Sequence, residues 1–334
     1  MILADDERTA PPMNRTGTGV EVGISFPFLS SPPRAFFDGE SPLSAGPREP
    51  ALRMPHDALV DGILRRLPGA APSRAYVGSE TCGRLIPPAA ALEAWLLAAS
   101  GGGWEVSLVL PPLERESQER AMECLRILSE APDAEVVVND WGAVHMVRKR
   151  FPGLSIVLGR LTHKTLRDPR LADHFDSPAA PAAARSALCR SGELAPGYRE
   201  LMKRYGIGRR EIDPFLQPLE DAEWEDRTER LSVHLPYLFV TMGRSCLLGA
   251  MHREREDKFI AGAPCRMECR AHAIEFRFPD PAGNGEGKRL LELGNALYHA
   301  VPQPVMERIL DLIPARRNLD RIVLTHPMAE GGRG

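Results

Sequence analysis

The sequence has few of the features that mark membrane-spanning, secreted or disulfide-rich proteins. It contains six cysteines and 6% aromatic residues in 334 residues, and no apolar run approaches the ~18 residues of a membrane span. The first 19 residues carry acidic side chains where a secretory signal would have a basic stretch followed by an apolar one. These absences predict a cytoplasmic protein with reduced thiols.

The sequence also lacks a strong excess of either charge. Forty-two Lys and Arg residues oppose 45 Asp and Glu residues, which gives a formal net charge of −3. A nucleic-acid partner or an anionic membrane partner is therefore not expected, although a local basic pocket is compatible with this balance. The 43% hydrophobic content is sufficient for a large buried core.

Common hydrolytic motifs are missing as well. The sequence contains neither a GxSxG elbow nor an HExxH helix, and no cysteine has an obvious histidine partner placed to activate it. A peptidase or hydrolase is therefore an alternative, not the first hypothesis.

Apolar runs typical of strands alternate with segments of helical periodicity along most of the chain. Several runs are continuously apolar, as in parallel strands covered on both faces. The expected strands are 20–26, 73–79, 104–110, 134–140, 154–161, 209–215, 231–240, 289–296 and 320–326, and the clearest helices are 55–67, 88–100, 113–131 and 141–151. About eight alternations predict an α/β fold, a (β/α)8 TIM-barrel-like single domain with extended βα insertions.

The composition also predicts where the domain begins and ends. Residues 1–19 are polar and aperiodic, so we expect a disordered N-terminal segment, and residues 329–334 resemble a flexible tail. The barrel domain is then expected over 20–328. Two stretches rich in Pro, Ser and Ala, 28–54 and 171–197, interrupt the alternation and are expected to be insertions near the catalytic face.

Four cysteines form a candidate metal site. Cys265 and Cys269 are four residues apart, which places both sulfurs on one face if a helical turn begins there. Cys246 and Cys82 each follow an expected strand, and the carboxyl ends of barrel strands share one face. A closed zinc site or an iron–sulfur cluster normally takes four protein ligands. We therefore expect Cys82, Cys246, Cys265 and Cys269 to bind a metal.

The remaining thiols and one histidine are weaker candidates. Cys124 shares the apolar face of an amphipathic helix, so a core role is expected, and Cys189 lies in the Pro- and Ala-rich insertion. His272 stands where a radical-SAM loop would have its third cysteine, so that motif is not intact. His272 is either a substitute ligand or, as we expect, a structural residue.

Polar residues at strand ends suggest a binding pocket beside these thiols. An arginine at such a position suits carboxylate or phosphate recognition, and a tryptophan can form a stacking wall. Asp140 or Asn139 has the alternative role of capping the following helix. The candidate substrate-binding residues are Asn139, Asp140, Trp141, Arg160, Arg244 and Asn295.

Several segments resemble the collagenase-like peptidase U-32 family. The similar residues are YVGSETCGR (76–84), the NDWG…LGRL…RDPR block (139–170) and YLFVTMGRSC (237–246), followed by the Cys265 and Cys269 pair. The arrangement of one early and three late cysteines is most similar to the UbiV branch. The resemblance implies a barrel-like fold and a [4Fe-4S] cluster held by Cys82, Cys246, Cys265 and Cys269.

The resemblance also implies a function and a partner. The UbiV branch, with a second U-32-type subunit, supports oxygen-independent hydroxylation in ubiquinone biosynthesis, so we expect a heterodimer that acts on a small anionic or aromatic substrate. The stretch between Cys246 and Cys265 and the N-terminal insertion depart from the family pattern. Three alternatives remain open: a zinc-dependent hydrolase, a cysteine peptidase and an RNA-modifying hydroxylase.

Overall fold

The computed structural model describes most of the chain. The described residues are 19–32, 60–67, 69–168, 180–188, 191–192, 195–216, 229–260, 263–279 and 288–325. Within these residues, no helix is long and apolar enough to cross a membrane.

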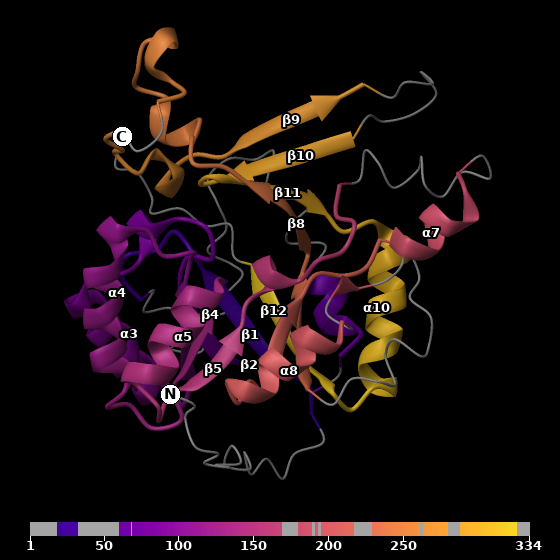
Figure 1. Ribbon diagram of the computed structural model, residues 1–334, viewed down its shortest axis with the longest axis horizontal. Coiled ribbons are helices and arrows are strands. Elements are labelled where there is room, and N and C mark those ends of the chain that lie inside the picture. The colour runs from indigo at the N-terminus through magenta and orange to yellow at the C-terminus, as the bar shows by residue number, and fades with distance from the viewer. Residues whose placement is uncertain are drawn as a thin grey trace.

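Eight parallel strands close into a barrel in the order β1-β12-β7-β6-β5-β4-β3-β2 (Figure 1). The predicted α/β barrel is therefore confirmed. The barrel strands are β1 (Glu21–Phe26), β2 (Pro72–Gly78), β3 (Glu105–Leu110), β4 (Glu135–Val138), β5 (Ser155–Leu158), β6 (Arg209–Ile212), β7 (Arg230–Leu235) and β12 (Leu319–Thr325).

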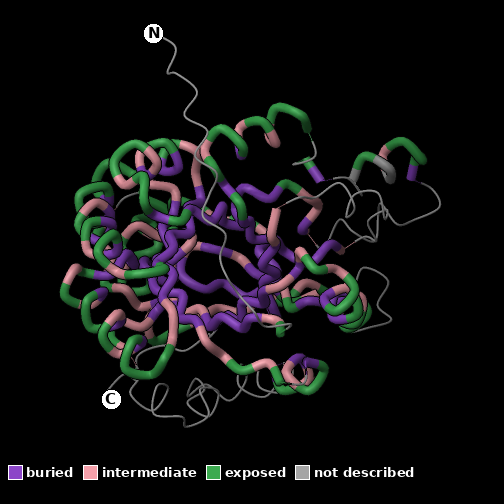
Figure 2. Tube along the Cα trace, turned by 90° about the horizontal axis from the view of Figure 1, so that it is seen from below, coloured by how far each residue is buried: buried purple, intermediate pink, exposed green. Residues whose placement is uncertain are grey.

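Helices cover the outside of the barrel because parallel neighbours need long crossover connections. Figure 2 shows the buried strands at the centre and exposed helical surfaces around them. The helices with defined bounds are α3 (Ala89–Gly101), α4 (Arg115–Leu128), α5 (Trp141–Arg150), α7 (Ala182–Leu188), α8 (Pro196–Arg204) and α10 (Gln303–Ala315). The helices predicted at 88–100, 113–131 and 141–151 correspond to α3, α4 and α5.

The interior of the barrel is filled in layers. Its middle layer is an apolar cluster made of Tyr76 and four buried valines on β3, β4, β5 and β12. Gly23 makes room for this layer, since a Cβ at Gly23 would lie 2.5 Å from the Tyr76 ring. The filled layer closes the barrel, so any ligand must bind at one of its two ends.

Charged side chains form the layer at the amino-terminal ends of the strands. Glu21 accepts hydrogen bonds from Arg74 at 2.8 Å and from Arg321 at 2.6 Å. Arg321 also donates to Glu135 at 2.5 Å, and Ser107 donates to the same carboxylate at 2.6 Å. All five side chains are buried, so the network joins β1, β2, β3, β4 and β12 where water cannot replace a lost partner.

A second, antiparallel sheet packs above the carboxyl ends of the barrel strands, in the order β8-β11-β10-β9 (Figure 1). Its strands are β8 (Tyr237–Met242), β9 (Ile274–Phe278), β10 (Lys288–Leu293) and β11 (Ala296–Ala300). The chain enters this sheet after β7 and returns to the barrel through α10.

Two predicted strands are corrected by this sheet. The run 231–240 is two strands, because Pro236 lacks a backbone donor and separates β7 in the barrel from β8 in the second sheet. The run 289–296 includes β10, which pairs with β9 and β11 and not with barrel strands. Cys246 therefore follows a strand of the second sheet, not of the barrel.

Several predicted segments lie wholly or partly outside the described residues. These are the N-terminal segment, the C-terminal tail, most of the insertion at 28–54 and much of the insertion at 171–197. The described part of the helix predicted at 55–67 is helical from 60 to 65.

The buried ion network predicts a large effect of one conservative substitution. Glu135→Gln leaves the buried Arg321 and Arg74 without a full counter-charge, so we expect a loss of about 3–5 kcal/mol in unfolding free energy. Urea unfolding followed by circular dichroism measures it. The exposed Glu130 provides the matched control, since Glu130→Gln is expected to change stability by less than ~0.5 kcal/mol. Equal effects of the two substitutions would contradict the role given to the network.

The same network predicts acid sensitivity. Burial alone would raise the pKa of Glu21, but Arg321 and Arg74 outweigh it and lower the pKa to about 2. Because an unfolded Glu titrates near ~4.3, the stabilisation is present above that pH and is lost as the pH falls towards 2. We expect urea midpoints to fall between pH 5 and pH 2. Glu21→Gln should flatten this dependence, and an unchanged profile in that variant would argue against Glu21 as a source.

Candidate metal centre

Four thiols from three parts of the chain meet between the barrel and the second sheet. Cys82 lies in the loop after β2, Cys246 in the loop after β8, and Cys265 and Cys269 in the segment before β9. Cys269 is buried and packs in one apolar cluster with the partly buried Cys82 and Cys246. Electrostatic interactions link Cys269 to each of the other three thiols. The four cysteines chosen from the sequence are thus brought together.

A glycine leaves space beside two of these sulfurs. A Cβ added to Gly249 would lie 2.9 Å from Cys265 Sγ and 3.6 Å from Cys246 Sγ. Gly249 lies in a short 3-10 turn, Leu248–Ala250, that packs against a second turn, Glu268–Arg270, containing Cys269. The absence of a side chain at Gly249 allows backbone and sulfurs to approach closely.

Backbone amides donate hydrogen bonds to three of the four sulfurs. Gly249 N–H donates to Cys246 Sγ at 3.2 Å, and Met267 N–H donates to Cys265 Sγ at 3.2 Å. The amides of the turn after Cys82 donate to its sulfur. Met267 has the left-handed conformation, with φ of 59°, which few non-glycine residues adopt. Amide donors of this kind stabilise negative charge on sulfur.

Burial makes Cys82, Cys246 and Cys269 poor nucleophiles in the absence of a metal. It raises the pKa of Cys82, raises that of Cys246 to about 11 and raises that of Cys269 to about 12, and the neighbouring thiols add to the last two shifts. Such thiols are protonated at neutral pH, whereas a nucleophilic cysteine needs a lowered pKa. A bound metal cation reverses this, because it deprotonates a coordinating thiol.

The structure contains no ready-made single-ion site within the part of the chain that it describes. Among the described residues, no group of three or more His, Cys, Asp or Glu side chains is arranged to hold one metal ion. A single zinc ion needs its sulfur donors within about 2.3 Å of one point.

Asn295 joins the two loops that carry Cys82 and Cys246. Its Nδ2 donates to Thr81 O and to Gly243 O, each at 3.0 Å, and its main-chain oxygen accepts from Gly243 N–H at 2.9 Å. The sequence predicts Asn295 as a substrate-binding residue. In the structure its hydrogen bonds hold the loops that carry Cys82 and Cys246.

Arg160 is a buried structural link. Its guanidinium donates to both oxygens of Glu80, at 2.8 Å and 2.5 Å, and to Asp213 Oδ1 at 2.9 Å. It also donates to Tyr237 O at 2.8 Å, at the start of the second sheet. With 1% of its surface exposed, this predicted anion-binding arginine already has two carboxylate partners.

The predicted residues of the NDWG motif stabilise loops and helix ends. Asn139 is buried, donates to Leu110 O at 2.9 Å and accepts from Leu161 N–H at 3.3 Å. Asp140 caps α5, because its side chain accepts from Ala143 N–H at 2.8 Å, which is the alternative considered from the sequence. Trp141 packs edge-on against Tyr198, with ring centroids 5.5 Å apart.

The other predicted residues are exposed or lie in the core. The Arg244 side chain is 84% exposed and its nearest counter-charge is Glu114, at 3.9 Å. His272 is exposed. Cys124 is buried in the core and bonds to Pro87 O at 3.2 Å, as the helical pattern predicted. Cys189 lies outside the described residues.

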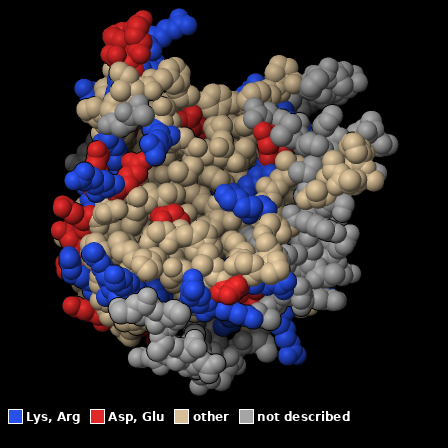
Figure 3. All heavy atoms as spheres, in the orientation of Figure 1, with Lys and Arg blue, Asp and Glu red and all other residues tan. Residues whose placement is uncertain are grey.

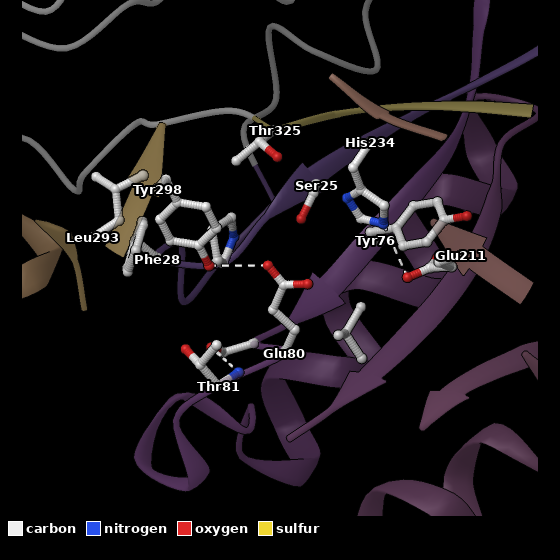
Figure 4. Close-up of a pocket in the computed structure, with 13 residues that line it drawn as sticks. Ser25, Phe28, Tyr76, Glu80, Thr81, Glu211, His234, Leu293, Tyr298 and Thr325 are labelled. Atoms are coloured by element: carbon white, nitrogen blue, oxygen red, sulfur yellow. Dashed lines mark hydrogen bonds and ion pairs between the residues drawn. The ribbon is translucent and has the colours of Figure 1, made fainter. Parts of the chain in front are cut away.

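A small cavity at the carboxyl end of the barrel was not predicted. Its volume is about 20 Å³, and Figure 4 shows residues of the barrel and of the second sheet around it. The polar lining residues that the sequence reasoning missed include Glu80, Glu211, His234 and Thr325. A signal was present, since Glu211, His234 and Thr325 each lie at or near the carboxyl end of a strand, on its inward face.

Comparisons with known proteins give little further information. No family model matches the chain, and no protein of curated function matches it. A solved structure described as "The Structure of the U32 Peptidase Mk0906" is similar over 97% of this chain and 98% of that chain, with 12% identity and a TM-score of 0.40. These values are too low to assign a family, and the barrel rests on the strand pairing described above.

Asn295 gives a direct test of the link between the cysteine loops. Asn295→Ala removes two hydrogen bonds and leaves two carbonyls to be satisfied by water, so we expect a loss of about 1–3 kcal/mol in unfolding free energy. Asn295→Asp, which keeps the size but not the donors, should behave similarly. Gln303→Ala, at an exposed position, should change stability by less than ~0.5 kcal/mol. A wild-type urea midpoint for Asn295→Ala would rule out the link.

Proposed function

We propose that this protein binds a [4Fe-4S] cluster through Cys82, Cys246, Cys265 and Cys269. The observation that carries the proposal is the convergence of four thiols that are distant in sequence, with amide donors directed at three of them. Four thiolates are the usual protein ligands of this cluster, and hydrogen bonds to sulfur are one of the factors that set its reduction potential.

A [4Fe-4S] cluster and a single zinc ion can both take four thiolate ligands, but they differ in size. In a four-iron cluster each thiolate binds a different iron, so the four sulfurs surround a group larger than one ion. Gly249 lets two of the sulfurs lie against its backbone, since a Cβ there would lie 2.9 Å from Cys265 Sγ and 3.6 Å from Cys246 Sγ.

We further propose that the protein acts in, or supports, oxygen-independent hydroxylation of a quinone precursor or another aromatic compound, as a U-32-type protein of the UbiV kind. This part depends on the sequence resemblance, which also suggests a second U-32-type subunit as partner. A cluster of this kind supplies one-electron transfer. An aromatic substrate is favoured over an anionic one, because Arg160 is bonded to Glu80 and Asp213 and Phe28 and Tyr298 line the nearby cavity.

Two alternatives have less support. A cysteine peptidase needs an activated thiol, and burial raises the pKa of Cys82, Cys246 and Cys269. An RNA-modifying enzyme needs a basic groove, but Arg167 is buried and the face drawn in Figure 3 mixes acidic and basic side chains among its described residues.

Anaerobic purification with iron and sulfide analysis tests the cluster. We expect about four irons and four sulfides per chain in the wild type and a brown colour. Single alanine substitutions of Cys82, Cys246, Cys265 and Cys269 should each reduce the iron content at least about twofold. Cys124→Ala, a thiol buried in the core between α4 and the barrel, is the matched control and should keep its iron.

Each other result would contradict the proposal. Zinc without iron in the anaerobic wild type would favour the zinc-dependent hydrolase, and iron that persists in all four variants would separate the metal from these cysteines. A wild type that holds neither metal after anaerobic reconstitution with iron and sulfide would leave the thiols with a packing role.

A further inference from the structure

Glu292 is a buried acid in the second sheet. It lies on β10, is 5% exposed, and is paired across the sheet with the apolar residues Ile274 and Leu297. Buried acids are usually paired with a base, as Glu21 and Glu135 are with arginines. Burial raises the pKa of Glu292, and within the described part of the chain only main-chain amides act in the opposite direction. Its burial therefore needs an explanation other than an ion pair.

The partners of Glu292 are the two amides that follow Cys246. Glu292 Oε1 accepts a hydrogen bond from Leu247 N–H at 3.1 Å, and Leu248 N–H donates to the same carboxyl group. The third amide of this turn, that of Gly249, donates to Cys246 Sγ at 3.2 Å. Successive main-chain amides of this kind form binding sites for anionic groups. The turn thus divides its donors between the side chain of Glu292 and the sulfur.

The hairpin that carries Glu292 contacts Cys246 a second time. β10 and β11 lie side by side (Figure 1) and are joined by residues 294–295. Cys246 Sγ donates to Gly294 O at 3.1 Å. A metal-bound cysteine has lost this hydrogen, so the contact with Gly294 requires a free thiol. The hydrogen bonds to Glu292 come from the main chain and do not depend on the state of the sulfur.

We propose that Glu292 is a positioning residue for the metal centre, because by accepting from the amides that follow Cys246 it fixes the turn that directs this cysteine towards the other thiols. The inference rests on the proposed function, since it takes these thiols to be metal ligands. The same turn lies against a second thiol, because a Cβ at Gly249 would lie 2.9 Å from Cys265 Sγ. A displaced turn would therefore disturb two of the four sulfurs. The role requires an oxygen that accepts, not a charge.

Two uncharged replacements separate the acceptor from the charge. Glu292→Gln keeps a side-chain oxygen, whose two lone pairs can accept from both amides. Glu292→Met keeps an unbranched chain of similar length but has no oxygen. After anaerobic purification, we expect Glu292→Gln to hold as much iron and sulfide as the wild type. Glu292→Met should hold at least about twofold less iron, because two buried amides lose their acceptor.

Alkylation shows which thiol has moved. Each protein is treated briefly with iodoacetamide, both as purified and after removal of metal, and mass spectrometry measures the reaction at each cysteine. Cys246 should react at least roughly tenfold faster in Glu292→Met than in Glu292→Gln, in which the turn keeps its acceptor. Cys82, in the loop after β2, should react equally in both variants to within about twofold. Both variants lack the charge, so a difference between them reports the hydrogen bonds alone.

Leu290→Ala is the matched control. Leu290 is buried on β10 two residues before Glu292, on the same face of the strand. This variant removes packing from the same strand but leaves the oxygens of Glu292 in place. We expect a lower unfolding free energy with wild-type iron content and wild-type alkylation of Cys246. Circular dichroism checks that every variant is folded.

The comparison of variants can overturn the proposal in three ways. Equal iron contents in Glu292→Gln and Glu292→Met, whether low or high, would mean that the acceptor does not position the turn. Equally faster alkylation of all four cysteines in Glu292→Met would indicate a general loosening of the second sheet. A loss of iron in Leu290→Ala as large as in Glu292→Met would assign the effect to the stability of β10.

Failure of the proposed function gives a different result. If the wild type binds no metal, the cluster is rejected, and the alkylation of metal-free protein still decides whether Glu292 positions the turn. A selective increase at Cys246 in metal-free Glu292→Met would support that role. Equal rates at Cys246 in metal-free Glu292→Gln and Glu292→Met would overturn it.

Discussion

The bonds of Arg160 connect the barrel to the second sheet. From the end of β5, its guanidinium reaches Glu80 in the loop after β2, Asp213 after β6 and the carbonyl of Tyr237 at the start of β8. Tyr298 of β11 donates to the same Glu80 carboxylate at 2.9 Å. Because Cys82 follows Glu80 by two residues, the contacts that hold the second sheet over the barrel also hold Cys82 near the other three thiols.

The barrel was predictable because its physical cause is local. Period-two and period-3.6 patterns record which side of each element is buried, and alternation of the two patterns leaves few topologies other than parallel strands with covering helices. The second sheet was not predictable in the same way. Its strands are partly exposed, and the run 231–240 was read as one strand although Pro236, which cannot donate to a sheet ladder, marks the boundary between β7 and β8.

The site could be predicted only in part. Cysteines are rare in this chain, so proximity to strand ends was enough to select Cys82, Cys246, Cys265 and Cys269. The polar candidates were chosen by the same rule, but their partners are tertiary: Asp140 caps a helix, and Arg160 is satisfied by Glu80 and Asp213. The sequence reasoning missed His234 because its role depends on its contact with Glu211, 23 residues earlier. Contacts between adjacent strands cannot be read from a sequence before the strand register is known.

The four thiols and the barrel cavity are built on different kinds of element. The thiols lie on loops of the second sheet and of β2, where turns can present amide hydrogens to sulfur, whereas His234, Glu211 and Thr325 lie on barrel strands whose inward positions are fixed by the register. Phe28 and Leu293 lie between them, in contact with the cysteine cluster and lining the cavity. Glu80 lines the cavity and precedes Cys82 by two residues, and it is bonded to both Arg160 and Tyr298. Displacement of the second sheet would disturb both sites together, because Tyr298 and Leu293 belong to that sheet.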